Sequence, residues 1–192
     1  SESPKILIAG CGTGQHAITT ASKYKNSKIL ALDLSLKSLS YAKRKANELK
    51  INNIDFIQGD ILDLESIDRK FDIIESVGVL HHMDNPFKGW KILTSCLNND
   101  SLRLIGLYSE RARQHIKEIK NKINKLKIQS TYKNIIKFRK DLIENNDDHW
   151  NYIKSSPDFY TVSGVRDLLF HVQDHRFTTV SYTHLTLPTS GV

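Results

Sequence analysis

The apolar residues of this chain occur in short runs separated by longer amphipathic stretches. Five runs have the length and composition of buried strands: 6–9, 29–32, 54–57, one that starts at 71, and 102–107. Ser35 is a suitable N-cap for a helix whose apolar face is Leu36, Leu39, Ala42, Ala46 and Leu49. Asn85-Pro86 starts another helix that reaches about Leu97. This alternation predicts an α/β, Rossmann-like, doubly wound fold with a mostly parallel sheet.

The first strand leads directly into a glycine loop, Gly10-Cys11-Gly12-Thr13-Gly14, and then into a helix from about Gln15. Glycines let the backbone turn tightly and approach a ligand without an intervening Cβ. The helix N-terminus presents free N–H groups and a positive dipole end. The second strand ends on Asp33, where a carboxylate can accept hydrogen bonds from both ribose hydroxyls. The sequence therefore predicts a nucleotide-cofactor site at the carboxyl ends of the strands.

Two frames of the glycine loop indicate different cofactors. Gly12, Gly14 and Ala17 fit the G-x-G-x-x-A pattern of nicotinamide enzymes, but that frame starts two residues after the strand ends at Ala9. From Gly10 the pattern is G-x-G-x-G, which resembles motif I of class I S-adenosylmethionine-dependent methyltransferases. An NAD-dependent oxidoreductase is the alternative interpretation.

Two later segments strengthen the resemblance to class I methyltransferases. Asp60 and Ile61 follow the third strand, where family members bind the adenine amino group and ring. The segment 71–86 resembles motif IV, which lies beside the methionine part of the cofactor and the substrate. The resemblance spans residues 5 to about 109. It implies S-adenosylmethionine as cofactor, bound by Gly10, Cys11, Gly12, Gly14, Asp33, Leu34, Asp60, Ile61, Ser76 and Val77.

One position departs from the family pattern. Members often carry an acidic residue two positions before the first glycine, where it helps to hold the amino group of the cofactor. In this chain that residue is Ile8, and we expect Glu75 or the backbone near Ser76 to take over this role. The turn before the fifth strand, often glycine-rich in the family, is expected at 98–101.

The family resemblance implies methyl transfer from a sulfonium to a nucleophile. Such an enzyme mainly aligns the nucleophile with the methyl group and excludes water. His81 and His82 are the candidates for a general base, if the acceptor needs one; the alternative is that they only shape the loop. The signatures of adenine, amide and arginine methylation are absent, so the acceptor, a small molecule or a protein, is not identified. We expect no metal site.

Composition indicates a cytoplasmic enzyme domain. The chain has 192 residues, of which 39% are hydrophobic, and its net charge is +7. It has no apolar run long enough to span a membrane. Its two cysteines, Cys11 and Cys96, do not form a disulfide framework, which fits a reducing compartment.

Charge and pattern predict three regions: a cofactor-binding core over 1–110, a basic helical lid or substrate region over 111–179, and a tail over 180–192. Residues 111–140 hold 11 basic residues and one acidic residue. Nucleic-acid binding by a non-catalytic module is the less favoured interpretation, because this stretch lacks interleaved aromatics. In the lid, we expect Phe159, Tyr160, His171 and His175 to face the substrate, the two histidines four apart on one helix.

The tail over 180–192 does not continue the domain pattern. It resembles the artefactual peptides that arise when adapter or vector DNA is translated, although a Thr-rich strand is the native alternative. We find no terminal antiparallel strand pair before it, so the chain is expected to be a fragment. The resemblance is closest to methyltransferase domains of uncharacterised bacterial proteins, some with helical repeats upstream, and such a repeat domain is expected to be missing from this chain.

Overall fold

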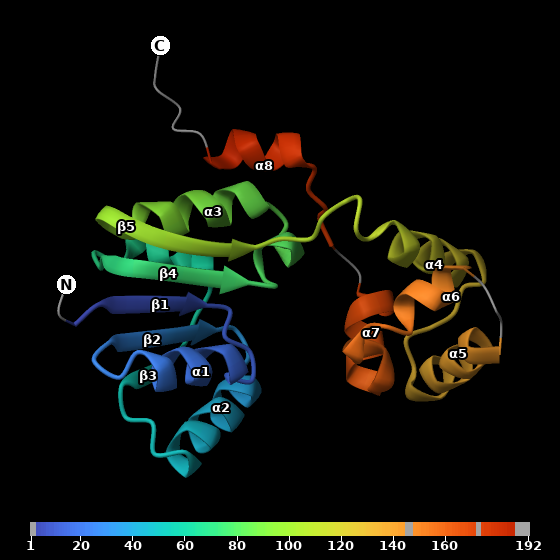
Figure 1. The fold of residues 1–192 in the computed structure, drawn as a ribbon, viewed down its shortest axis with the longest axis horizontal. Helices are drawn as coiled ribbons and strands as arrows, with labels where there is room; N and C mark the ends of the chain where they lie inside the picture. The colour runs from blue at the N-terminus through green and yellow to red at the C-terminus, as the bar shows by residue number, and fades with distance from the viewer. Residues whose placement is uncertain (1–2, 145–147, 172–173, 187–192) are drawn as a thin grey trace. The chain divides into compact units, whose positions relative to one another are not determined.

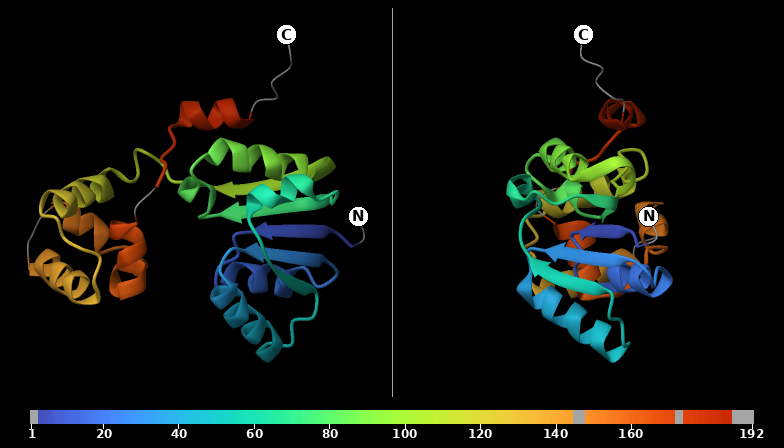
Figure 2. Two further views of the ribbon diagram at one scale, coloured as in Figure 1. Left: turned by 180° about the vertical axis from the view of Figure 1, so that it is seen from behind. Right: turned by 90° about the vertical axis from the view of Figure 1, so that its left-hand side faces the viewer.

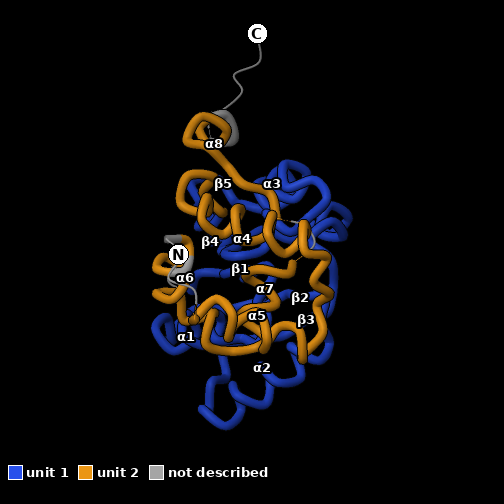
Figure 3. Tube along the Cα trace, turned by 90° about the vertical axis from the view of Figure 1, so that its right-hand side faces the viewer, with its two compact units in different colours: residues 1–107 blue, residues 108–192 orange. Residues whose placement is uncertain are grey.

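The computed structural model describes residues 3–144, 148–171 and 174–186. The chain divides into two compact units, Ser1–Leu107 and Tyr108–Val192 (Figure 3). Among the described residues, no helix is both long and apolar enough to cross a bilayer.

The first unit is built on a five-stranded parallel sheet (Figure 1). Its strands are β1 (Lys5–Ala9), β2 (Lys28–Asp33), β3 (Ile54–Gln58), β4 (Phe71–Val77) and β5 (Leu97–Gly106). Every neighbouring pair in the order β3-β2-β1-β4-β5 is parallel. The chain builds the sheet outward from β1 to the edge strand β3 and then from β4 to the opposite edge strand β5. The point at which the strand order reverses therefore lies between β1 and β4. The predicted doubly wound α/β fold is confirmed.

Helices cover both faces of this sheet (Figure 2). They are α1 (Gln15–Lys23), α2 (Leu36–Glu48), the short 3-10 helices η1 (Ile61–Ser66) and η2 (Leu80–His82), and α3 (Pro86–Ser95). Ala17 and Ala21 of α1 and Leu39 of α2 pack in one buried cluster with Ile6 and Ile8 of β1. Right-handed crossovers that run in opposite directions from the switch point put α3 on the other face.

The predicted turn at 98–101 is wrong, because these residues lie inside β5. Leu97 pairs with Phe71, but the next regular pair joins Leu102 to Ile73. The intervening residues of β5 therefore bulge away from β4, and Asp100 absorbs the bend with a positive φ of 57°. Asn98 Nδ2 fixes the bulge by donating a 2.8 Å hydrogen bond to Asp72 Oδ1.

The predicted start of α2 is confirmed at Ser35. Its side chain accepts a hydrogen bond from the backbone N–H of Ser38, as an N-cap does. Leu39, Ala42 and Ala46 are buried as predicted, whereas Leu36 and Leu49 at the two ends are mostly exposed. The apolar stripe of α2 is thus shorter than its sequence pattern indicates.

Replacing Ser35 with alanine is expected to lower the free energy of unfolding of the first unit by about 1 kcal/mol, because one N–H of the first turn loses its acceptor. Urea-induced unfolding measures this difference. Ser40→Ala is the matched control, since the Ser40 hydroxyl only donates back to the Leu36 carbonyl in mid-helix. Equal losses in the two variants would contradict a specific capping role.

The second unit has a helical core of its own. Its helices are α4 (Gln114–Lys125), α5 (Tyr132–Glu144), α6 (Asp148–Ile153), the 3-10 helix η3 (Pro157–Tyr160), α7 (Val162–Phe170) and α8 (Thr179–Thr186). A buried cluster joins the apolar faces of several of them, and it includes Ile119, Ile135, Phe138, Phe159 and Leu169. The buried residues of α4, within the basic stretch, are its isoleucines Ile116, Ile119 and Ile123, so this helix turns its apolar face to the core.

Two predictions for this unit are wrong. Phe159, expected to face a substrate, is fully buried in the core cluster of the second unit, while Tyr160 beside it is 62% exposed. The helix expected to hold both histidines ends at Phe170, and His171 is its extended C-cap residue. His171 and His175 therefore do not share a helix.

The C-terminal region is described as far as residue 186. Residues Thr179–Thr186 form α8, so the Thr-rich strand considered as the native alternative is not observed there. Residues 187–192 lie outside the described part of the chain. That the segment 180–192 is non-native stays a prediction.

Candidate functional site

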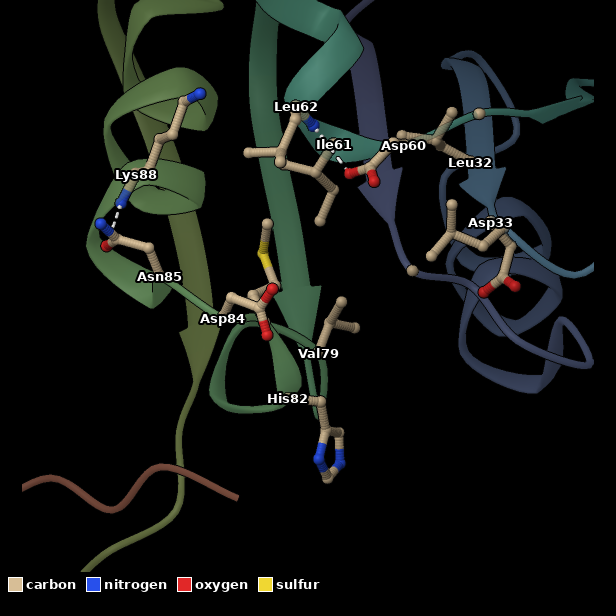
Figure 4. Close-up of a pocket in the computed structure, with 14 residues that line it drawn as sticks. Leu32, Asp33, Asp60, Ile61, Leu62, Val79, His82, Asp84, Asn85 and Lys88 are labelled. Carbon is tan, nitrogen blue, oxygen red and sulfur yellow. Dashed lines mark hydrogen bonds between the residues drawn. The ribbon is translucent and has the colours of Figure 1, made fainter. Parts of the chain in front are cut away.

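A cavity of about 540 Å³ lies at the carboxyl ends of the strands of the first unit (Figure 4). This volume is in the range of small-molecule sites. The cavity is lined by the last residues of β2, by residues that follow β1, β2, β3 and β4, and by the first turn of α3: Gly10, Leu32, Asp33, Leu34, Gly59, Asp60, Ile61, Leu62, Val79, His82, Met83, Asp84, Asn85 and Lys88.

The glycine loop is shaped by three residues with positive φ: Gly10 at 80°, Gly12 at 53° and Gly14 at 84°. A Cβ on Gly10 would lie 2.2 Å from Val79 Cγ2, and one on Gly14 would lie 2.5 Å from Ala42 Cβ. A Cβ on Gly12 would meet no atom within 4 Å. Gly10 and Gly14 are thus required by close packing, whereas Gly12 faces open space, as a loop that admits a ligand must.

Asp33 joins the glycine loop to the start of α2. Its Oδ2 accepts a 2.7 Å hydrogen bond from the Gly12 N–H, and its Oδ1 accepts a 2.8 Å bond from the Ser35 N–H. Each carboxylate oxygen can accept a second hydrogen bond, so Asp33 retains capacity for ligand hydroxyls. The adjacent Leu34 lines the same cavity and is 67% exposed.

Asp60 lies at the next strand end and begins η1. Its Oδ1 accepts a 2.9 Å hydrogen bond from the Leu62 N–H, while Asp63 Oδ2 accepts from the Asp60 N–H. This reciprocal capping box fixes the Asp60 carboxylate beside the cavity (Figure 4). Ile61 follows it and is almost fully buried in the cavity wall.

The two candidate histidines have different environments. His81 is fully buried, and His82, next to it in η2, lines the cavity. Their ring centroids lie 4.2 Å apart in an edge-on arrangement. Of the two, only His82 is therefore accessible to a ligand in this cavity.

The structure brings together only some of the predicted cofactor residues. Those that line the cavity are Gly10, Asp33, Leu34, Asp60 and Ile61. Cys11, Gly12, Gly14, Ser76 and Val77 do not line it, although they lie close in sequence to residues that do. Ser76 is fully buried, and among the described residues its hydroxyl has no hydrogen-bond partner.

Sequence reasoning misses several lining residues. Val79, Met83, Asp84 and Asn85 belong to the segment that resembles motif IV, so the pattern identifies the segment without singling out these side chains. Lys88, in the first turn of α3, carries no sequence signal, because a lysine on an amphipathic helix normally faces solvent.

Cys11 is a residue of the glycine loop whose side chain packs in the buried cluster of the first unit, and it has no features of a reactive thiol. Burial, followed by the charge of Asp33, raises the pKa of Cys11 to about 12. The thiol is therefore protonated at neutral pH, and the thiolate is the reactive form.

Cys11 is expected to resist alkylation in the folded protein. At pH 8, iodoacetamide should modify Cys11 at least about 100-fold more slowly than free glutathione, because little thiolate is present. Peptide mass spectrometry measures the rate of alkylation. Unfolding in guanidinium chloride should raise this rate to that of a free thiol. Rapid modification of the folded protein would show that the loop opens.

The residues present suit an adenosine-containing cofactor. Two carboxylates at neighbouring strand ends, Asp33 and Asp60, flank one cavity and can accept hydrogen bonds from hydroxyl and amino groups. Gly12 leaves open space near the N-terminus of α1, where an anionic group is favoured. The first unit thus offers separate places for a sugar, a base and an acidic end.

Comparison with known proteins agrees with this geometry. The model of a family described as a methyltransferase domain matches residues 1–155. An uncharacterized protein of Synechococcus sp. is 33% identical over 121 residues, which cover 62% of this chain and 29% of that protein. A probable (S)-tetrahydroprotoberberine N-methyltransferase 2 of Papaver bracteatum is 34% identical over 100 residues, 52% of this chain and 28% of that protein. The chain thus spans less than a third of the length of these relatives.

A solved structure, PKMT2 from Rickettsia typhi, shares the fold with a TM-score of 0.76 and 21% identity. The match covers 96% of this chain and 38% of that protein, so it includes the second unit. The same protein has been solved in complex with AdoHcy, with a TM-score of 0.71 and 23% identity.

These comparisons decide between the two cofactor classes left open by the glycine pattern. The family that matches residues 1–155 is a methyltransferase family, and the relative in Papaver bracteatum is named as a methyltransferase. Neither finding fits a nicotinamide enzyme. Together with the parallel sheet and the cavity at the ends of its strands, they show that the chain belongs to the methyltransferase domain family, as a class I domain that uses S-adenosylmethionine.

Proposed function

We propose that this domain transfers a methyl group from S-adenosylmethionine, bound in the cavity of the first unit, to a nitrogen nucleophile of an acceptor. The observation that carries the proposal is the convergence of Asp33, Asp60 and Gly10, the first residue of the glycine loop, on one cavity. A nitrogen acceptor is supported by relatives named as N-methyltransferases, in Papaver bracteatum and Eschscholzia californica. The acceptor would be a small molecule or a protein side chain.

Each part of the cofactor has a proposed contact. Asp33 would accept hydrogen bonds from the ribose hydroxyls and Asp60 from the adenine amino group, with Ile61 against the ring. The backbone of the glycine loop and the N-terminus of α1 would hold the carboxylate of the amino-acid half. Leu34 would border the adenosine, and Ser76 and Val77 would lie beside the methionine part.

The bound cofactor supplies a methyl group already activated on a sulfonium. The protein's contribution is then to align the acceptor at about 3 Å and to exclude water. An amine that binds protonated must first lose a proton to become nucleophilic. His82 is our candidate for accepting it, since its side chain lines the cavity and that of His81 is buried.

The test is calorimetry with S-adenosylhomocysteine and NAD in parallel. We expect S-adenosylhomocysteine to bind and NAD to show no heat above dilution. To find the acceptor, the protein is then incubated with S-adenosylmethionine and a panel of primary, secondary and tertiary amines. The release of S-adenosylhomocysteine measures methyl transfer to each amine. Tight NAD binding without S-adenosylhomocysteine binding would overturn the proposal.

We also propose a cytoplasmic location. Both cysteines of the chain, Cys11 and Cys96, are free thiols in the structure, as is usual in a reducing compartment.

A further inference from the structure

Glu75 is a carboxylate on an inner strand of the sheet. It lies on β4, between β1 and β5, and its side chain is only 13% exposed. A carboxylate removed from water to this extent needs hydrogen-bond donors. Its register partner on β1 is Ile8, which packs in the buried cluster under α1. Glu75 therefore faces α1.

Two side chains of α1 supply those donors. His16 Nε2 lies 2.8 Å from Glu75 Oε2, and Thr20 Oγ1 donates to the same oxygen at 3.2 Å. A carboxylate only accepts, so Nε2 of His16 must carry a proton. The two donors are four residues apart and thus share one face of α1. Glu75 holds this helix at two successive turns.

The contact is close to the glycine loop. α1 begins at Gln15, directly after Gly14, so His16 is the second residue of the helix. The backbone N–H of Ile18 donates to the Gly14 carbonyl at 2.8 Å, and that of Gly14 donates to the Cys11 carbonyl at 2.9 Å. Holding the first turn of α1 therefore also restrains the end of the loop.

The charge of Glu75 suits this position. A negative side chain near a helix N-terminus is stabilised by the helix dipole. The pair with His16 alone would contribute little, because the His16 side chain is 47% exposed. The buried side of the contact, through Thr20 and the inner strand, gives it a fixed geometry.

We propose that Glu75 is a positioning residue: through His16 and Thr20 it holds the first turn of α1 and the end of the glycine loop in the conformation that binds the amino-acid half of the cofactor. This inference rests on the proposed function. It differs from the sequence expectation that Glu75 itself holds the cofactor amino group, because its carboxylate contacts two side chains of α1. The acidic residue that restrains the loop would thus lie on β4, as the register partner of Ile8, and not at position 8 on β1 itself.

The test compares two ligands that share adenosine. S-adenosylhomocysteine carries the amino-acid half, and 5′-methylthioadenosine lacks it. We expect Glu75→Ala, which removes both hydrogen bonds to α1, to weaken S-adenosylhomocysteine binding about tenfold. His16→Ala leaves the Thr20 bond in place and should weaken this binding less, about threefold. Both variants should change 5′-methylthioadenosine binding less than about twofold. The double variant should lose no more than Glu75→Ala alone, since the loss of Glu75 already breaks the contact with His16. Glu75→Gln, which keeps an acceptor oxygen, should recover part of the affinity.

Asp72→Asn is the matched control. Asp72 lies at the other end of β4, where its carboxylate accepts from the Lys5 N–H and from Asn98, both at 2.8 Å. Asp72→Asn should not change the ratio of the affinity for S-adenosylhomocysteine to that for 5′-methylthioadenosine. A loss in Glu75→Ala that His16→Ala does not share would overturn positioning in favour of direct contact with the ligand. Equal losses for both ligands, or no loss for either, would also overturn it.

Amide hydrogen exchange tests the same inference without a ligand. In Glu75→Ala, the amides of Gly14 and Ile18 should exchange about tenfold faster, whereas that of Ile29, bonded to the Asn53 carbonyl across the sheet, should not change. If the wild-type protein binds neither ligand, the proposed function fails, and this exchange pattern alone decides whether Glu75 positions the loop. Unchanged exchange at Gly14 and Ile18 would overturn the inference.

Discussion

Replacing Asp33 with alanine is expected to lower the affinity for S-adenosylhomocysteine at least about 100-fold. Two charge-assisted hydrogen bonds to the ribose would be lost, each contributing about 1.5–3 kcal/mol, and about 1.4 kcal/mol corresponds to tenfold in affinity. Asp33 also accepts the N–H groups of Gly12 and Ser35, so the variant removes the link between the glycine loop and α2. Isothermal titration calorimetry measures the loss.

Asp55→Ala is the matched control for this prediction. Asp55 is an exposed carboxylate on β3, and it does not line the cavity. Its removal should change the affinity less than about twofold, since it makes no contact with the proposed site. Asp33→Asn, which keeps one acceptor oxygen, should fall between the wild type and Asp33→Ala. Wild-type affinity in Asp33→Ala would remove Asp33 from the cofactor site.

Gly14→Ala is expected to lower the free energy of unfolding of the first unit by about 2–5 kcal/mol. A left-handed φ costs an L-residue about 1–2 kcal/mol, and overpacking costs about 1–3 kcal/mol more. Both apply at Gly14, because φ is 84° and the new Cβ would meet Ala42 Cβ at 2.5 Å and its Cα at 3.2 Å. Guanidinium-induced unfolding measures the change.

Gly12→Ala separates the two costs. Its φ is 53° but a Cβ would meet nothing within 4 Å, so only the conformational cost, about 1–2 kcal/mol, should appear in unfolding. Because the loop backbone is proposed to hold the amino-acid half of the cofactor, Gly12→Ala is also expected to lower the affinity for S-adenosylhomocysteine, although Gly12 does not line the cavity. Equal stability losses in the two variants would contradict the different packing of these glycines.

The order of strands and helices in the first unit can be predicted because it depends on local patterns. A run such as 6–9 must be buried on both faces, and a glycine loop followed by an amphipathic stretch turns into a helix whatever lies nearby. The same local logic fails at 98–101, where polar residues that are typical of a turn form a bulge within β5. The bulge depends on the register with β4, which no local pattern contains.

The kinds of residue that form the candidate site can be predicted from the sequence, but only some of the individual residues can. Asp33 and Asp60 each follow a strand, and the ends of parallel strands meet at one edge, so their convergence can be expected. Which of His81 and His82 faces the cavity depends on one turn of η2, where adjacent residues point in different directions. The sequence places Phe159 at a substrate-facing surface, but an aromatic after a turn is equally suited to a core, and packing with Val165 and Leu169 decides it.

The sequence by itself determined the α/β class, the order of the strands along the chain and the cofactor class suggested by the loop from Gly10, because strand, glycine and helix signals act over a few residues. Only the tertiary structure decided that Glu75 contacts His16, 59 positions away, and that Lys88 reaches the cavity. Contacts of this kind arise from packing between segments that are distant in the chain. The side chains they use are, in the sequence, ordinary charged residues on a strand or a helix.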